Sequence, residues 1–175
     1  MPTSFLTPDC SSCDALCCVL LAFDASNAFA VNKPACEACR HLSADNSCEI
    51  HAELLDHGYK GCATYTCYGA GQRIAQSLFK GRSWRHDASI MPAMEDTFRR
   101  LRRVHEAAWL LQEAAILPLP PDAEQRRRDL LAALDANQDW TEASLRDFEL
   151  GGGLKSVPPF LASLRDLTSV KPSRR

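Results

Sequence analysis

The nine cysteines of this 175-residue chain all lie before position 68. Four of them fall in one stretch, CSSCDALCC, which runs from Cys10 to Cys18. A chain of this length buries about two-thirds of its surface on folding and does not need cross-links to build a core. The clustered thiols therefore indicate a dedicated centre in the first third of the chain. Three kinds are open: a metal site, a set of disulfides, or a group of buried apolar cysteines.

The sequence favours a reducing compartment for these thiols. The first ten residues, MPTSFLTPDC, carry no Lys or Arg and no continuous apolar stretch, so they do not match a secretory signal. The longest apolar run, ALCCVLLAF, ends at Asp24 and is too short to span a bilayer. We therefore expect a cytoplasmic protein that does not enter the membrane. There, clustered cysteines more often bind metal than form disulfides, and an odd number of them leaves one thiol unpaired.

Charge is distributed unevenly along the chain. Residues 1–67 hold three Lys or Arg against eight Asp or Glu, a balance of −5, whereas residues 68–175 hold 17 against 14, a balance of +3. A zinc finger that binds nucleic acid presents a basic surface, so we expect no nucleic-acid partner. The basic run RRLRR, from Arg99 to Arg103, has Asp96 and Glu106 at helical spacing. We expect it to form an ion-paired helix face.

Hydrophobic spacing predicts a mainly α-helical protein with a cysteine-rich front. In the front we expect a helix over about 9–23, an extended piece over 28–31, and a helix over 48–57 that ends before Gly58. If 9–23 is helical, Cys10, Cys13 and Cys17 fall within an arc of about 60° and can converge on one centre, whereas Cys18 lies about 100° from Cys17. Cys18 would then serve a second centre or the core, unless the helix breaks there.

Behind the cysteines the pattern predicts a helical region, a small bundle-like part over 73–175 that packs on the cysteine-rich region 1–72 in one compact domain. A first helix should end at Gly81, and a long one should begin near Pro92 and end at Pro118. We also expect an Asp122–Gln125 capping box that starts a helix over 123–136, a Thr141 cap, a stop at 151–153 and a last helix from Pro159. The apolar stripe expected for the long helix is Met94, Phe98, Leu101, Val104, Ala108, Leu111 and Ala115.

Three segments together resemble the YkgJ-type zinc- or iron-chelating cysteine-cluster proteins. They are CSSCDALCC, CRHLSADNSCEIH from Cys39 to His51, and GCATYTCYGAGQ over 61–72. The family pattern is CxxCxxCC, then C-x2-L-x2-D-x2-C-x-I followed by Tyr or His, then a further cysteine near an aromatic residue. Leu42, Asp45 and Ile50 occupy the three matching positions. The YxCxGAGQ form is also similar to the front of some pentapeptide-repeat proteins, but no such repeat follows here.

The resemblance covers about residues 9–72 and implies a ligand set of eight thiols. Here the first motif has one extra residue, CxxCxxxCC, His51 stands where many relatives have Tyr, and Cys36 has no counterpart. Eight thiolates suit two four-thiolate sites or one cluster plus a structural ion. Zinc and an iron–sulfur cluster fit them equally. The implied ligands are Cys10, Cys13, Cys17, Cys18, Cys39, Cys48, Cys62 and Cys67.

Three hypotheses for function follow. The first is a structural or redox-sensing metal centre whose helical remainder contacts a protein partner. The second is an iron–sulfur enzyme or electron-transfer protein with a substrate between the cluster and His105. The third is metal buffering or delivery. The sequence shows no Ser–His–Asp or paired-carboxylate signature, so it favours a role without catalysis.

Overall fold

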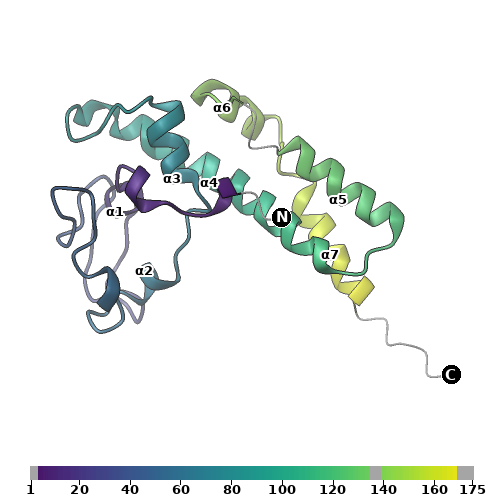
Figure 1. The fold of residues 1–175 in the computed structure, drawn as a ribbon, viewed down its shortest axis with the longest axis horizontal. Helices are drawn as coiled ribbons and strands as arrows, with labels where there is room; N and C mark the ends of the chain where they lie inside the picture. Colours follow the sequence, from purple (N-terminus) through teal and green to yellow (C-terminus); the bar gives the residue numbers. More distant parts are fainter. Residues whose placement is uncertain (1–3, 135–138, 169–175) are drawn as a thin grey trace.

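A computed structural model describes residues 4–134 and 139–168, and this part of the chain is mainly helical, as predicted (Figure 1). It contains no strand, only the isolated bridges Phe23–Lys33 and Leu42–Cys48. Single turns of 3₁₀ or π type complete the fold: η1 Ser4–Leu6, η2 Cys10–Ser12, η3 His51–Glu53, η4 Ile74–Leu78, η5 Ala88–Ile90 and η6 Ala114–Ile116. The α-helices are α1 Leu16–Leu20, α2 Lys60–Thr64, α3 Ala70–Arg73, α4 Met91–Glu113, α5 Pro121–Ala133, α6 Glu142–Leu150 and α7 Val157–Thr168.

Helix α4 is the element on which the rest of the molecule packs. Its 23 residues rise about 35 Å, and the predicted stripe from Met94 to Leu111 is buried. Ala115 is the exception, because it lies in η6 and is exposed. Helices α1, α3, α5 and α6 all contact α4. Figure 1 shows α4 running from the cysteine-rich loops to α5 and α7.

The predicted helix over 9–23 is wrong, because the backbone leaves the helical conformation between Cys13 and Ala15. Asp9 accepts hydrogen bonds from the Ser11 amide and from the Ser11 and Ser12 hydroxyls, which favours a single 3₁₀ turn. Cys13 is then extended (φ −105°, ψ 136°) and Ala15 is left-handed (φ 52°, ψ 32°). The single stripe of Cys10, Cys13 and Cys17 therefore does not exist.

The predicted helix over 48–57 is also wrong, and only the turn η3 forms there. Asp45 accepts hydrogen bonds from the Ser43 and Ser47 hydroxyls and from the Ser47 amide. Cys48 forms a bridge with Leu42, so the backbone is extended where the helix was expected to begin. Polar side chains that bond to nearby backbone compete with a helix in this way. The extended piece at 28–31 forms no strand either.

The later helices follow the sequence more closely. Thr141 caps α6, and its hydroxyl accepts from the Ser144 amide at 3.1 Å. The predicted capping box at Asp122 and Gln125 is wrong, because α5 begins at Pro121, directly after the N-cap residue Pro120, and has no side-chain cap. The last helix begins at residue 157 rather than at Pro159. The predicted continuation of α5 to 136 falls partly outside the described residues.

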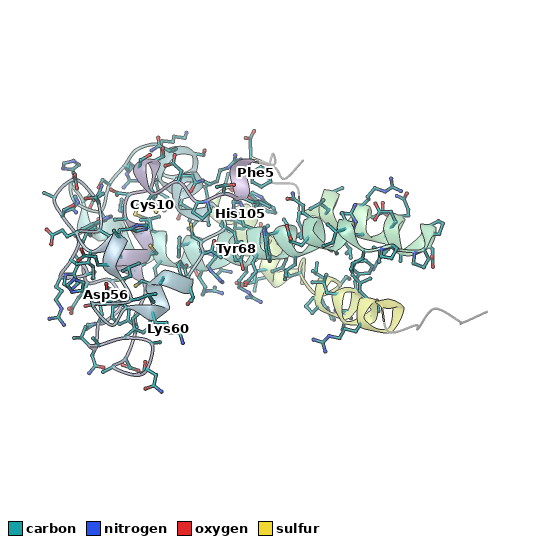
Figure 2. All side chains as sticks on the ribbon, turned by 60° about the horizontal axis from the view of Figure 1, so that its bottom comes forward. Phe5, Cys10, Asp56, Lys60, Tyr68 and His105 are labelled. Carbon is teal, nitrogen blue, oxygen red and sulfur yellow. The ribbon has the colours of Figure 1, made fainter. Side chains whose placement is uncertain are left out.

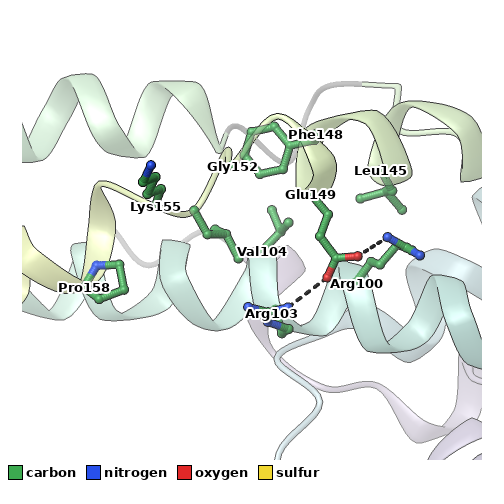
Figure 3. A pocket seen from close by; sticks show the side chains of 10 residues that line it. Arg100, Arg103, Val104, Leu145, Phe148, Glu149, Gly152, Lys155 and Pro158 are labelled. Carbon is green, nitrogen blue, oxygen red and sulfur yellow. Dashed lines mark hydrogen bonds and ion pairs between the residues drawn. The ribbon is translucent and has the colours of Figure 1, made fainter.

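The arginines of the RRLRR run form ion pairs, as predicted, but most of them also join two helices. Arg99 and Arg103 each donate to Glu149 of α6 at 2.8 Å, and Arg100 pairs with the same carboxylate. Figure 3 shows Glu149 reaching Arg100 and Arg103 beside a cavity of about 300 Å³. The Arg99 guanidinium, followed by those of Arg100 and Arg103, lowers the pKa of Glu149. No helix in the described part of the chain has the length and apolar content needed to cross a bilayer.

Candidate metal centre

The nine cysteines lie in the loops and short helical turns of residues 10–67, which contact α4 through α1. All nine thiols are free, so the disulfide alternative is absent from this structure. Cys10 and Cys62 are exposed, and the other seven are partly buried. Figure 2 shows sulfur atoms in the region around Cys10, at the far end of the molecule from α5 and α7.

The segment 7–13, which carries Cys10 and Cys13, lies beside α3 and the turn η4. The Gln72 side chain donates to the Thr7 carbonyl at 2.7 Å and accepts from the Asp9 amide at 3.1 Å. The Gln76 amide nitrogen donates to the Ser12 carbonyl at 3.0 Å. These three bonds place the first two cysteines beside the start of α3. Cys67 lies three residues before the first residue of that helix, and the Ala70 amide donates to its carbonyl at 3.0 Å.

Gly71 is the position where α3 comes closest to the thiols. A Cβ atom there would lie 2.5 Å from the Cys13 sulfur and 3.9 Å from the Cys67 sulfur. The first distance is shorter than real Cβ contacts allow, so only glycine lets the Cys13 sulfur occupy this place. Both sulfur atoms therefore lie near the part of α3 where Gly71 has no side chain.

We expect Gly71→Ala to destabilise the protein, although alanine is the better helix former by about 1 kcal/mol. Overpacking of this kind costs about 1–3 kcal/mol and would displace the Cys13 sulfur. Thermal unfolding and metal content of the variant measure both effects. The control is the same change in a Cys13→Ala background, where the clash is gone and the substitution should be neutral or stabilising. Equal destabilisation in both backgrounds would contradict the role given to the sulfur.

Cys17 and Cys18 lie on the single turn of α1, with their sulfur atoms 3.9 Å apart. Leu16, Val19 and Leu20 of the same turn are at most 1% exposed and anchor α1 in the core. The hydrogen bond between the two thiols lowers the pKa of Cys18 to about 7. The adjacent pair is thus fixed at the boundary between the core and the loops.

Cys39 and Cys48 lie in the loops that follow α1. The Cys39 amide donates to the Cys18 carbonyl at 3.0 Å, and a turn then leads through Leu42 to the bridge with Cys48. Arg85, far away in the sequence, donates to the Ser43 carbonyl at 2.8 Å and holds this turn. Cys62 lies on α2 and is exposed.

We sort the predicted ligands into two sets, with Cys18 interacting with members of both. Burial raises the pKa of Cys13 to about 12 and that of Cys62 to about 11. Thiolate repulsion adds to this, from Cys67, Cys10 and Cys18 for Cys13, and from Cys18, Cys39 and Cys48 for Cys62. We name the two sets by their surroundings: the α3 group is Cys10, Cys13, Cys17 and Cys67, and the loop group is Cys18, Cys39, Cys48 and Cys62. Cys10 also interacts with Cys18 and Cys48, so the groups adjoin.

Two side chains of α4 hold the segment around Cys67. His105 is 1% exposed, and its Nδ1 lies 2.7 Å from the Tyr68 carbonyl. Arg102 donates to the Thr66 carbonyl at 3.2 Å. Burial lowers the pKa of His105 to about 4, so its Nδ1 donates as the neutral ring. His105, Phe5 and Tyr68 lie together beside α4 in Figure 2. The sequence pointed to His105, but nothing in it indicated the contact of Arg102 with the cysteine loop.

The two residues that the sequence left open lie at the edge of this arrangement. Cys36 occupies a left-handed turn position (φ 57°) and its amide donates to the Leu20 carbonyl at 3.4 Å. His51 is exposed and borders a cavity of about 450 Å³ together with Cys62 and Tyr65.

The donor set suits a soft or borderline metal, because thiolates select zinc and iron–sulfur clusters. In this conformation, however, no three His, Cys, Asp or Glu among the described side chains are grouped closely enough to hold a metal ion. Protonated thiols gain little free energy from coming together, since neutral sulfur atoms attract one another only weakly.

Comparisons with known proteins give a relative without an assigned function. The chain is 38% identical over 109 residues to the uncharacterized protein YybG of Bacillus subtilis strain 168. This match covers 62% of the present chain but only 39% of the length of that protein. No family model matches the chain, and no solved structure matches it.

Proposed function

We propose that residues 9–72, here called the cysteine lobe, bind metal through the eight thiols of the α3 group and the loop group. The observation that carries this proposal is the lack of a core in the middle of the lobe. Between residues 21 and 58 no apolar side chain is buried. A segment of this length without a core needs another source of stability, and metal–thiolate bonds supply it in small domains.

The state of the thiols supports the same proposal. Burial disfavours the thiolate and thereby raises the pKa of four thiols, those of Cys10, Cys13, Cys48 and Cys62. For Cys17 the largest cause is the hydrogen bond to Cys18. A bound cation reverses this preference, since the thiolate is the ligating form. Metal binding would then release protons, draw the sulfur atoms together, and weaken as the pH falls.

The grouping supports two four-thiolate sites rather than one. The sulfur atoms of Cys17 and Cys18 lie 3.9 Å apart, so this pair lies where the two groups adjoin. We assign Cys17 to the α3 group because it also interacts with Cys13 and Cys67, and Cys18 to the loop group because Cys48 and Cys62 interact with it. The α3 group would link the N-terminal segment to α3, and the loop group would hold residues 39–48 and α2 on α1.

A structural or redox-sensing centre is the role that fits best. The lobe joins α4 through the packing of α1 and α3 and through the hydrogen bonds of Arg102 and His105. A change in metal occupancy would thus alter the contacts that the lobe makes with α4. Trp109 and Leu110 of that helix are 36% and 39% exposed and offer an apolar contact for a protein partner.

Metal buffering is the second candidate, and the exposure of Cys10 and Cys62 favours it. Ligands that reach solvent can exchange a metal with a chelator or a recipient protein. Slow exchange, over hours, with a competing chelator would rule this role out and leave the structural one.

The test is elemental analysis and a visible spectrum of protein purified without oxygen. We expect stoichiometric metal: colourless protein with zinc, or brown protein with iron and sulfide that a reductant bleaches reversibly. The bleaching result would favour electron transfer. Folded protein with nine reactive thiols and no bound metal would refute the proposal.

A further inference from the structure

Lys33 is the one buried residue between residues 21 and 58. It is 7% exposed, whereas Arg40 and Lys60, the other two basic residues of 1–67, are exposed. Removing an ammonium group from water is costly unless hydrogen bonds and a counter-charge compensate for it. Nothing in the hydrophobic pattern of this part of the chain accounts for a buried lysine.

Hydrogen bonds fix the ammonium in one place. Its Nζ donates to the carbonyls of Val19, Leu21 and Pro34 at 2.9, 2.6 and 2.9 Å. These three acceptors use all three of its protons. The backbone of Lys33 exchanges two hydrogen bonds with Phe23, whose ring centroid lies 5.8 Å from Nζ. The side chain can therefore neither rotate toward solvent nor act as a metal ligand.

The fixed ammonium lies beside the loop group. Val19, whose carbonyl accepts one of its hydrogen bonds, follows Cys18 in the chain. The backbone carbonyl of Cys18 in turn accepts a hydrogen bond from the Cys39 amide. No carboxylate of the described residues forms an ion pair with Lys33 within 4.0 Å. The titratable groups that interact with it are Cys18, Cys36, Cys39, Cys62 and Glu37. Apart from Glu37, its potential counter-charges are thus all thiols.

We propose that Lys33 is the built-in counter-charge of a metal site formed by Cys18, Cys39, Cys48 and Cys62. This inference rests on the function proposed above. A divalent ion with four thiolates has a net charge of −2, and holding that charge partly out of water is unfavourable. The Lys33 ammonium reduces the local charge to −1 without occupying a coordination position. Lys33 is therefore a positioning residue that stabilises the thiolate form of the ligands.

A purely structural role would explain the same hydrogen bonds differently. Val19 and Leu21 lie at the end of α1, where a cation can satisfy free carbonyls. The charge of the side chain distinguishes the capping role from the counter-charge role. A neutral donor could replace Lys33 as a cap, but only a cation can replace it as a counter-charge.

The experiment compares Lys33→Gln, Lys33→Arg and the exposed control Lys60→Gln in the full chain. Zinc affinity is measured by competition with a chromophoric chelator, without oxygen, at several pH values. Lys33→Gln should weaken zinc binding at the loop group about 10- to 100-fold, the range seen when a residue behind a metal ligand is removed. It should also move the pH of half-loading upward, because protons then compete better for the thiolates. Lys33→Arg should restore most of the affinity, and Lys60→Gln should leave it unchanged, since solvent screens an exposed charge.

Four results would overturn the inference. The first two are an unchanged zinc affinity and pH profile in Lys33→Gln, and a loss of affinity in Lys60→Gln equal to that in Lys33→Gln. The other two are equal losses of affinity in Lys33→Gln and Lys33→Arg with no shift of the pH profile, and a loss of zinc from the α3 group instead of the loop group. Wild-type protein that binds no zinc or iron would refute the proposed function itself, which is a different outcome. Should Lys33→Gln fail to fold, Lys33→Met gives the same neutral readout and is judged by the same criteria.

Discussion

Removing the metal should unfold the loops of the cysteine lobe while α4 to α7 remain folded. Metal binding supplies roughly 10–16 kcal/mol in small thiolate domains, and residues 21–58 have no buried apolar side chain to replace it. Helices α4, α5 and α6, by contrast, contribute nine buried apolar side chains to one core, among them Phe98, Leu130 and Leu145. The two parts of the chain therefore depend on different sources of stability.

Hydrogen exchange is the suitable measurement, since the lobe has few helical residues and its loss would change the far-ultraviolet circular dichroism little. Chelation under reducing conditions should remove the protection of the Cys39 and Leu42 amides, which bond to the carbonyls of Cys18 and Cys39. The amides of α4 between Phe98 and Val104 are the internal control. Protection of the Cys39 amide that survives complete removal of metal would show that the loops fold without it.

Single substitutions in the two thiol groups should each remove one metal and leave the other. Cys13→Ser takes a ligand from the α3 group, and Cys39→Ser takes one from the loop group. Since the groups use different thiols, each variant should keep about half of the metal of the wild type. The matched control is Cys36→Ser, which removes a cysteine of the same lobe that lies outside both groups and should keep all of it.

Metal analysis of the three variants, purified without oxygen, gives the answer. If Cys13→Ser and Cys39→Ser each lose all metal, the eight thiols hold one polynuclear centre. If Cys36→Ser loses metal, the ligand set is wrong. The double variant of Cys13 and Cys39 should be metal-free under the two-site arrangement.

Much of the fold was predictable because a long helix repeats its pattern many times. The stripe of α4 from Met94 to Leu111, the Thr141 cap and the helical segment before Gly81, formed by α3 and the π turn η4, are each specified by neighbours in the sequence. The expected helix over 9–23 failed for a local reason that the pattern of apolar residues hides. Asp9 binds Ser11 and Ser12, and this competition decides the backbone at a place where only one turn of helix could form.

The ion-paired arginine face shows the same limit from the other side. Asp96 and Glu106 were identified as partners because they lie within one turn of Arg100 and Arg102. Glu149 was not, since it lies almost fifty residues away and meets the arginines only after α6 packs on α4. Contacts of this kind leave no spacing in the sequence.

The sequence by itself determined the mainly helical class and the place of the thiols in the first third of the chain. Helix periodicity and residue type are local properties, so they can be read without a fold. Tertiary structure alone decided which thiols adjoin, that Gly71 leaves room for the Cys13 sulfur, and that Lys33 is enclosed by three carbonyls. These features arise from hydrogen bonds and packing between segments far apart in the chain, where the partner of each group is set by the folded backbone.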